Sequence, residues 1–250
     1  MSLTLSPIPG LPAVHPGDDL AALVLDALRG AGMQLAVGDI IVLCQKVVSK
    51  AEGRVARLAE ITPSPFAHRV AAQTTGKDPR IIEVILRETT RIIRMDRGHL
   101  IVETGPGWVC ANAGVDESNS IGPETVILLP KDPDASARQL RAAFRARAAV
   151  DVAVLITDTF GRPWREGLVD FALGLAGMDA QMDLRGERDL AGRELHHTVM
   201  AQADALAAAA GLLMRKGAAL PAVLVRGYEF TPADGNAASL IRERQFDLFR

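Results

Sequence analysis

Residues 152–165 read Val-Ala-Val-Leu-Ile-Thr-Asp-Thr-Phe-Gly-Arg-Pro-Trp-Arg, and this stretch decides the class of fold. Its first five residues form an apolar, β-branched run, which is typical of a strand buried on both faces of a sheet. Open sheets in α/β proteins bind ligands beyond the carboxyl ends of such strands. The polar residues from 157 onward therefore lie where a functional site is expected.

Asp158 and Thr159 carry the chemistry of this stretch. A carboxylate beside a hydroxyl group offers two hard oxygen ligands to a divalent cation. Gly161 permits a tight turn, and the guanidinium groups of Arg162 and Arg165 can each bind a phosphate or carboxylate through two parallel hydrogen bonds. The same residues also suit a strand that ends in a polar turn with two solvated arginines. The stretch alone leaves both interpretations open.

Strands and helices alternate along the rest of the chain, which predicts a mixed α/β (α+β) fold. Asp18 and Asp19 supply a cap for a helix over 20–28, and the Asp-Pro pairs at 78–79 and 132–133 begin two more, the first of which runs to about Glu88. Further helices are predicted at 167–175 and 198–214, and strands at 40–44, 100–102, around 109, and at 125–129, 152–156 and 222–225. No repeat or linker divides the chain, so one domain over 1–250 is expected, with two closely packed lobes as the alternative.

Composition excludes several classes of partner. The chain has 28 Lys and Arg against 30 Asp and Glu, which gives a formal net charge of -2. Such a balance produces no long-range field to attract nucleic acid or an anionic membrane, so neither partner is expected. No apolar stretch reaches the roughly 18 residues that a membrane-spanning helix needs. Any phosphate site must therefore depend on charged groups close to the phosphate and not on the net charge of the chain.

The two cysteines indicate a reducing compartment. Cys44 and Cys110 both lie in apolar surroundings and not in a Cys-x-x-Cys pair, so they are predicted to be small buried side chains and not metal ligands or a disulfide. The first residues also lack the basic region and apolar core of a signal peptide. A cytoplasmic location is expected.

The segment 110–119 is a second candidate for ligand binding. Gly114 and the alanines beside it let the backbone approach a ligand, while Asp116, Ser118 and Asn119 present oxygen and amide groups. The alternative is an ordinary turn, because Asp, Ser and Asn favour turns for local reasons. Together with Asp158, however, Asp116 would supply a second carboxylate to a magnesium ion that also binds nucleotide phosphates.

Lys46 and Lys50 follow the predicted strand at 40–44. Their spacing of four aligns them on one face if this segment is helical, and ammonium groups commonly bind phosphate. The alternative is an exposed basic face shared with Arg54 and Arg57.

Familiar signatures for nucleotides and zinc do not occur in the sequence. There is no Gly-x4-Gly-Lys-Ser/Thr loop, and Gly105 with Gly107 lacks the third glycine of a dinucleotide fold. The five histidines show no zinc-ligand spacing, and the adjacent His196 and His197 are predicted to be solvated or hydrogen-bonded side chains and not metal ligands. Neither class of site is predicted.

Several ordered motifs place the chain beside a known family. They are Leu11-Pro12, Pro16-Gly17-Asp18-Asp19, Lys46-Val-Val-Ser-Lys-Ala-Glu-Gly53, Cys110-Ala-Asn-Ala-Gly114 with Asp116 and Ser118-Asn119, Leu129-Pro130 with Asp132-Pro133-Asp134, the run 157–165, and Gly186, Asp189, 192–195 and Thr198. In this order and spacing the chain resembles the coenzyme F-420:L-glutamate ligases over nearly its whole length. The number of motifs makes the likeness far more specific than a single glycine motif.

The resemblance implies a GTP-dependent ligase that joins L-glutamate to a deazaflavin coenzyme precursor through an acyl phosphate. It implies Mg²⁺ or Mn²⁺ as the divalent cation, with K⁺ as a further candidate cofactor, and a homodimer. Some relatives carry a fused flavin-binding reductase-like domain, and none is expected here. It places the metal on Asp116, Asp158 and Thr159. It assigns the GTP contacts to Leu11, Pro12, Ala13, Val14, Gln45, Lys50 and Asn119.

Arg162 and Arg165, together with Asp158, complete the set of residues that we expect to act in catalysis. The two arginines would hold an acidic substrate, either the precursor or the incoming glutamate. A metal clamp and a lysine suit this chemistry, because transfer of a γ-phosphoryl group depends on positioning and charge neutralisation and needs no protein nucleophile.

Some positions depart from the family pattern. Gln45 stands where serine or threonine is usual, Trp108 replaces phenylalanine, Ala205 stands where an acidic residue is common, and 213–216 read Leu-Met-Arg-Lys and not the usual Met-Gly sequence. Whether residues 204–216 add a nucleotide or metal contact is therefore left open. Two rival functions remain: a metal-dependent phosphohydrolase or nucleotide-binding enzyme with another phosphorylated substrate, and a non-enzymatic nucleotide sensor or assembly protein.

Overall fold

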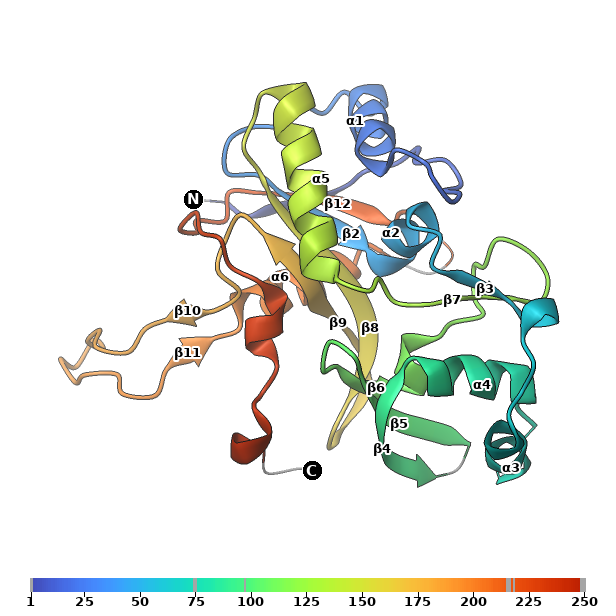
Figure 1. Cartoon of the computed structure of the whole chain (residues 1–250). Coiled ribbons are helices and arrows are strands. Elements are labelled where there is room, and N and C mark those ends of the chain that lie inside the picture. Colours follow the sequence, from blue (N-terminus) through green and yellow to red (C-terminus); the bar gives the residue numbers. More distant parts are fainter. Residues whose placement is uncertain (1, 74–75, 97, 215–216, 218, 248–250) are drawn as a thin grey trace.

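A five-stranded sheet forms the centre of this computed structural model, which describes residues 2–73, 76–96, 98–214, 217 and 219–247 (Figure 1). Strands β2 and β8 are parallel neighbours, and every other pair in this sheet is antiparallel. The order across the sheet is β1 (Thr4–Pro7), β12 (Ala222–Arg226), β2 (Ile40–Cys44), β8 (Ala153–Arg162) and β9 (Arg165–Ala176).

Helices cover both faces of this sheet, as the apolar run at 152–156 predicted. Successive residues of β8 alternate between two cores: Val154 packs toward α1 (Leu20–Gly30) and α5 (Pro133–Ala148), and Leu155 packs toward α6 (Gln202–Gly211). Because both faces are covered, both sets of side chains are removed from water and contribute hydrophobic stabilisation. The predicted mixed α/β (α+β) class is confirmed.

The predicted helix caps are present. Asp19 accepts a hydrogen bond from the backbone of Ala22, and Asp132 accepts one from Ala135. Asp78 accepts one from Arg80 and precedes the proline that begins α4 (Pro79–Arg87). These side chains satisfy amide groups that the first turn of a helix leaves without partners.

A third core lies beside the main sheet, in the lobe at the lower right of Figure 1. Its centre contains Ile82 and Ile85 of α4 together with Leu100 and Val102 of β5. The strands expected at 100–102 and around 109 are present, and they pair antiparallel. The elements of this region are α3 (Pro65–Gln73), α4, β4 (Thr89–Asp96), β5 (His99–Thr104), β6 (Val109–Ala111), β3 (Val55–Arg57) and β7 (Thr125–Ile127), and short 3₁₀ helices occur at Leu58–Glu60 and Asn112–Gly114.

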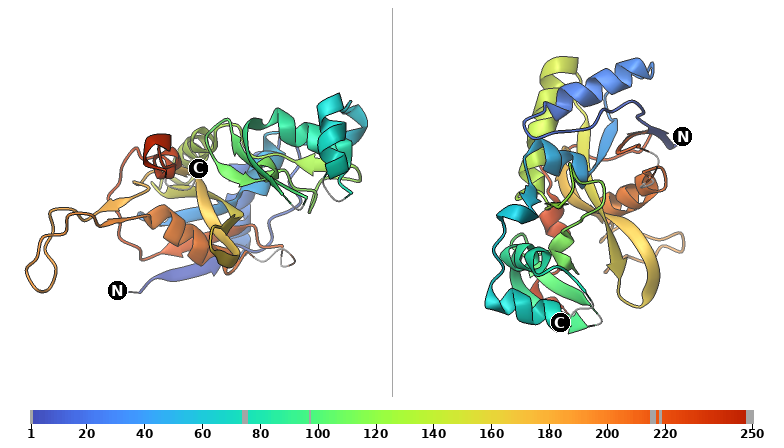
Figure 2. Two further views of the ribbon diagram at one scale, coloured as in Figure 1. Left: turned by 90° about the horizontal axis from the view of Figure 1, so that it is seen from below. Right: turned by 90° about the vertical axis from the view of Figure 1, so that its right-hand side faces the viewer.

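The predicted helix at 167–175 is wrong, because these residues belong to strand β9. Strands β8 and β9 form a long antiparallel hairpin in which Arg162 pairs with Arg165 across the turn at 163–164. The right-hand view of Figure 2 shows this ribbon (yellow) extending past the end of the sheet. Local helix propensity is overridden here because pairing with β8 along the length of β9 satisfies the backbone groups on one edge of this strand.

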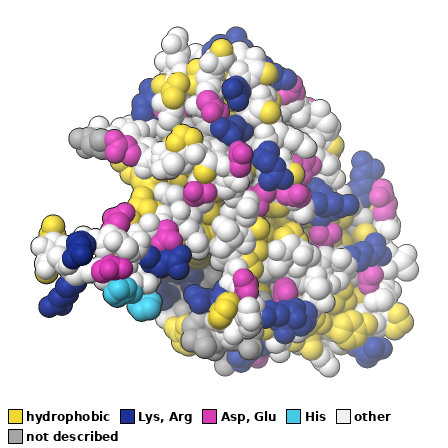
Figure 3. Space-filling view, turned by 60° about the vertical axis from the view of Figure 1, so that its left-hand side comes forward, with side chains coloured by type: hydrophobic (Ala, Val, Ile, Leu, Met, Phe, Trp, Pro, Cys, Tyr) yellow, Lys and Arg dark blue, Asp and Glu magenta, His cyan; other side chains and the backbone are white. Residues whose placement is uncertain are grey.

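The predicted helix at 198–214 is shorter than expected. Residues 199–200 pair with 182–183 as strands β11 (Val199–Met200) and β10 (Met182–Asp183), and the helix α6 covers only Gln202–Gly211. Between β10 and β11 the chain forms an arm that projects from the body (Figure 2), and charged side chains of both signs lie along it (Figure 3). His196 and His197 are exposed on this arm, as predicted.

Two further 3₁₀ helices, Ala237–Leu240 and Arg244–Phe246, follow β12. Over the described part of the chain, no helix combines the length and apolar character needed to span a bilayer.

Candidate functional site

The end of β2 creates an open edge on β8. Cys44, the last residue of β2, pairs with Thr157, and beyond this point β8 continues with β9 alone. The chain turns from Cys44 directly into α2 (Gln45–Ala51). A cavity of about 770 Å³ lies at this edge, bounded by α2, the segment 111–120, the β8–β9 hairpin and the N-terminal residues 11–14.

Asp116 reaches this cavity from a turn that is anchored on β7. Its backbone exchanges two hydrogen bonds with Ile127, and its Oδ1 accepts one from the backbone of Ser118 at 2.7 Å. Its Oδ2 lies 2.7 Å from Nζ of Lys46, which also donates to the hydroxyl and carbonyl groups of Ser118. Burial acts to raise the pKa of Asp116, but the hydrogen bonds from Lys46 and Ser118 outweigh it and lower the pKa.

Gly114 shapes the start of this turn. A Cβ atom at this position would lie 2.7 Å from the side chain of Leu129, and the residue has a φ of +68°. Only glycine meets both conditions without strain. The close approach that this glycine allows is to Leu129, and an approach of the backbone to a ligand stays a prediction.

Asp158 lies in the same cavity, on the strand opposite α2. Burial raises its pKa to about 7, and the charges of Asp116 and Asp170 act in the same direction, while the amide of Thr159 and the charge of Lys46 lower it. Asp116, Asp158 and Asp170 thus all line the cavity that Lys46 and Lys50 also line. Because a buried carboxylate is costly without a positive partner, this arrangement favours the binding of a cation.

Thr159 and Asp170 form a direct cross-strand pair in the hairpin. The hydroxyl of Thr159 donates to Oδ1 of Asp170 at 2.7 Å, and both residues line the cavity. Thr157 also lines it, and among the described residues its buried hydroxyl has no hydrogen-bond partner. Unpaired buried hydroxyl groups are rare in proteins, so this oxygen is available to a ligand.

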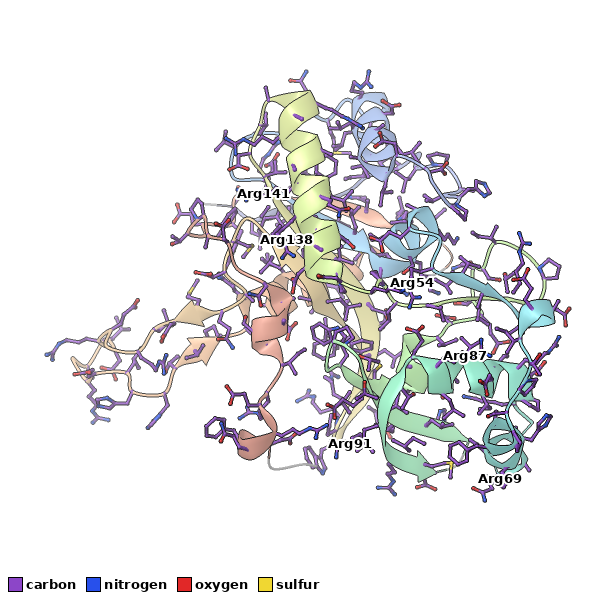
Figure 4. The ribbon with its side chains drawn as sticks, in the orientation of Figure 1. Arg54, Arg69, Arg87, Arg91, Arg138 and Arg141 are labelled. Atoms are coloured by element: carbon purple, nitrogen blue, oxygen red, sulfur yellow. The ribbon has the colours of Figure 1, made fainter. Side chains whose placement is uncertain are left out.

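Most of the residues expected to contact a nucleotide line this cavity. They are Leu11, Pro12, Ala13, Val14, Lys50 and Asn119. Burial, together with the charge of Lys46, lowers the pKa of Lys50. Lys46 and Lys50 therefore share the inner face of α2, whereas Arg54 turns away and bonds to Glu88 and to the carbonyl of Leu129 (Figure 4).

Gln45 differs from the other expected nucleotide contacts. Its side chain is fully buried, and it does not line the cavity. Its Oε1 accepts a hydrogen bond from the hydroxyl of Ser49 at 2.8 Å, whereas its Nε2 has no partner in the part of the chain that the structure describes. Gln45 is the first residue of α2 and one of the buried residues of this helix. Its contact with a nucleotide stays a prediction.

Arg162 and Arg165 lie at the far end of the hairpin, outside the cavity lining. Arg162 donates a 3.3 Å hydrogen bond to the carbonyl of Glu166, and Arg165 is exposed. Phe160, Gly161 and Leu168 occupy the hairpin between these arginines and Asp158, and they line the outer part of the cavity. The arginines can therefore meet only a substrate that extends well beyond the carboxylates.

The two cysteines are free, as predicted. Cys44 lines the cavity, but burial raises the pKa of its thiol to about 11. A neutral thiol is a poor nucleophile and a poor metal ligand. Cys110 is buried, and its pKa is raised to about 12 for the same reason.

Comparison with known proteins shows the family of this chain. Residues 10–227 match the family described as F420-0:gamma-glutamyl ligase. The chain belongs to this family. It is 46% identical over 253 residues to the coenzyme F420:L-glutamate ligase of Methanothermobacter thermautotrophicus and 48% identical over 254 residues to that of Methanopyrus kandleri. These matches cover 100% of this chain and 100% and 98% of the two relatives.

A third relative gives the same result. The coenzyme F420:L-glutamate ligase of Halobacterium salinarum is 46% identical over 235 residues, which cover 92% of this chain and 88% of the relative. The expected resemblance to the F420 ligase family is thus confirmed, and this member of the family is a ligase-type enzyme.

The sequence did not reveal Asp170 as a site residue, and it did not place Lys46 on Asp116. Asp170 lies within 167–175, where the sequence pattern predicts a helix, so the pattern does not place it opposite Thr159. The turn signal was present: a proline at 163 between two arginines suits the second position of a tight turn and indicates a hairpin. The Arg162–Arg165 pair alone would place Leu168 opposite Thr159, and an irregularity in the ladder between Gly161 and Arg162 brings Asp170 there instead. Of the departures at 213–216, Arg215 and Lys216 lie outside the described residues.

Proposed function

We propose that this chain forms an amide bond between L-glutamate and a carboxylate of the deazaflavin coenzyme precursor, with GTP as the co-substrate. One observation carries the proposal: in a member of the F420 ligase family, Asp116, Asp158 and Thr159 line the same cavity as Lys50 and Asn119. An acidic oxygen cluster beside ammonium groups suits a triphosphate with its divalent cation.

The proposed reaction has two steps. A carboxylate oxygen of the precursor attacks the γ-phosphorus of GTP, the bond to the β-phosphate oxygen breaks, and GDP leaves. The amine nitrogen of glutamate then attacks the carbon of the acyl phosphate, loses a proton, and displaces inorganic phosphate. Neither step needs a nucleophile from the protein, so the residues of the cavity have only to position the reactants and balance their charge.

A divalent cation, Mg²⁺ or Mn²⁺, fits the donor set of the cavity. Asp116, Asp158 and Thr159 would hold it, because hard cations prefer carboxylate and hydroxyl oxygens, and burial together with the neighbouring carboxyl groups raises the pKa of Asp158. When bound, the cation would neutralise charge on the phosphoryl group being transferred. Asp116 must then exchange or share its bond to Lys46, whose ammonium group would be released toward the phosphates.

The nucleotide contacts follow from the walls of the cavity. Lys50 and Lys46 would face the phosphates from α2, and Asn119 and the segment 11–14 would contact the rest of GTP. The precursor would enter along the β8–β9 hairpin, where Phe160 and Leu168 offer an apolar wall. Arg162 and Arg165 would then bind an acidic group at the outer end of this substrate.

Two further expectations stay proposals. We infer a homodimer, and the exposed apolar side chains of Leu190 and Met200 on the arm are candidates for a contact between copies. We also infer action in the cytoplasm, on small-molecule substrates.

Product analysis tests the proposed function. Purified protein is incubated with GTP, Mg²⁺, glutamate and the precursor, and GDP and the coenzyme product are followed by chromatography and mass spectrometry. A ligase releases GDP in step with an amide product and only when both acceptor substrates are present. GDP released in the absence of glutamate and precursor would instead identify a phosphohydrolase. GTP bound without turnover under all conditions would indicate a sensor.

A further inference from the structure

We propose that Asp170 is a positioning residue, which holds the hydroxyl group of Thr159 so that its lone pairs face the cation site. This inference rests on the proposed function, because it assigns a task to a residue next to the proposed ligands. It adds a residue of β9 to a site that the sequence had placed on β8 and in the segment 110–119.

The register of the hairpin fixes the pair. Thr159 and Asp170 are directly opposite in the antiparallel β8–β9 ladder, so their side chains lie on the same face. The hydroxyl of Thr159 donates to Oδ1 of Asp170 at 2.7 Å. A threonine hydroxyl has one hydrogen and two lone pairs. Because the hydrogen is directed to Asp170, only acceptor capacity remains, and this is what a cation requires.

The backbone of Gly211 packs closely against the carboxyl group of Asp170. A Cβ atom at Gly211, the last residue of α6, would lie 2.6 Å from Oδ2 and 2.7 Å from Cγ of Asp170. The φ of Gly211 does not lie in the left-handed region, so this glycine is required for space and not for backbone conformation. Helix α6 thus closes the position behind the carboxyl group and limits its movement away from Thr159.

Asp204, on α6, also contacts β9, and its contact has a purely structural role. Asp204 accepts a hydrogen bond from the backbone amide of Ala172 at 3.0 Å and does not line the cavity. That contact ties a helix to a strand. Asp170 instead bonds to a side chain that faces the cavity, and burial raises the pKas of both carboxyl groups. Asp170 is therefore a buried carboxyl group whose hydrogen bond acts on a residue of the candidate site.

Outer contacts of this kind tune metal binding in proteins. Partners that orient a ligand typically change metal affinity or activity by roughly 10- to 100-fold when they are removed. A carboxylate that accepts the hydroxyl hydrogen also increases the negative charge on the oxygen, which strengthens its interaction with a hard cation.

The test measures Mn²⁺ binding by electron paramagnetic resonance of the free ion, with the full chain and saturating GDP. The variants are Asp170→Ala, Thr159→Val and the double variant, with Asp204→Ala as the matched control. We expect each single variant at the pair to weaken Mn²⁺ binding by about 10- to 100-fold, and the double variant to bind no more weakly than Thr159→Val alone. Asp204→Ala should lower stability toward denaturant without changing Mn²⁺ affinity.

The conservative variant Asp170→Asn keeps an acceptor oxygen for Thr159, so it should bind Mn²⁺ more tightly than Asp170→Ala; it also serves if the alanine variant does not fold. Unchanged Mn²⁺ affinity in either Asp170 variant or in Thr159→Val would overturn the proposal. So would an equal loss from Asp170→Ala in the wild-type and Thr159→Val backgrounds, which would make Asp170 a direct ligand. Wild-type protein that binds no Mn²⁺ at all would overturn the proposed cation site as well.

Discussion

The ammonium nitrogen of Lys46 lies 2.7 Å from Oδ2 of Asp116, which joins the helix after β2 to the turn anchored on β7. The pair is largely sheltered from water, since the side chain of Lys46 is only 12% exposed and that of Asp116 32% exposed. Lys46 therefore provides the positive charge at a carboxylate that we assign to a divalent cation. Under the proposed function, this ion pair and the cation would compete for the same oxygen atoms.

This competition gives the first prediction. Replacing Lys46 with Met should strengthen Mn²⁺ binding in the absence of nucleotide by about tenfold, because both the competing bond and the charge repulsion are removed. The same variant should raise the KM for GTP, since an ammonium group is lost from the phosphate side. Titration of Mn²⁺ by electron paramagnetic resonance measures the first effect. Lys50→Met is the matched control, because it removes the same charge from α2 without touching Asp116, and weaker Mn²⁺ binding in Lys46→Met would contradict the assignment.

The second prediction concerns turnover. Asp158→Asn should fold normally and lose activity by about two orders of magnitude or more, which is typical of removing one well-placed electrostatic group. The rate of GDP release in the complete reaction measures this loss, and circular dichroism checks the fold. Full activity in this variant would remove Asp158 from the site.

The third prediction is a pH dependence of stability. Burial raises the pKa of Asp158 to about 7 in the folded protein, above the 3.8 of an ordinary aspartate. The folded state therefore holds a proton that the unfolded state has already lost, and the contribution of this group to the free energy of unfolding falls as pH rises from about 4 to 7. Below that window both states are protonated, and the contribution is constant.

Denaturant unfolding in metal-free buffer at pH 5 and pH 8 measures this effect. Asp158→Asn has no charge to desolvate, so it should be stabilised relative to the wild type at pH 8 and much less so at pH 5. Added Mn²⁺ should stabilise the wild type at pH 8 by binding the ionised form. An equal difference between the two proteins at both pH values would show that Asp158 is not desolvated.

The fourth prediction uses two glycines that end helices. Gly211→Ala would place a Cβ atom 2.6 Å from the carboxylate of Asp170, so it should disturb the pair with Thr159 and weaken Mn²⁺ binding. Gly30, the last residue of α1, has open space at the same atom, and Gly30→Ala should be neutral or stabilise the fold by up to about 1 kcal/mol. Mn²⁺ titration and denaturant unfolding of both variants distinguish the two effects. Equal behaviour would mean that the space at Gly211 is not needed.

The fifth prediction concerns the end of the hairpin. Arg162→Ala should raise the KM for the precursor or for glutamate while the KM for GTP stays the same, because the guanidinium lies outside the cavity that would hold the nucleotide. Arg188→Ala, on the exposed arm, is the control. Steady-state kinetics with each substrate varied in turn provide the measurement, and unchanged constants would remove Arg162 from substrate binding.

Local patterns predicted much of the fold. The apolar runs at 40–44, 152–156 and 222–225 are central strands, and the caps at Asp19, Asp78 and Asp132 begin helices where expected. These features depend on neighbouring residues: an apolar run needs only cover, and a cap bonds to an amide two or three positions away. The elements that failed, at 167–175 and in the first part of 198–214, depend on pairing with strands elsewhere.

The sequence by itself determined the family, the central strands, the capped helices and the identity of Asp116, Asp158 and Thr159 as candidate ligands, since each of these is carried by residues close together in the chain. Only the tertiary structure decided that β9 is a strand and that Asp170 faces Thr159. It also decided that Lys46 binds Asp116 and that Gln45, the first residue of α2, is buried. The physical reason is that the ladder irregularity, burial and charge pairing depend on the packing of other segments of the chain, such as the 110–119 turn against α2. Their free energies depend on distances that no local pattern contains.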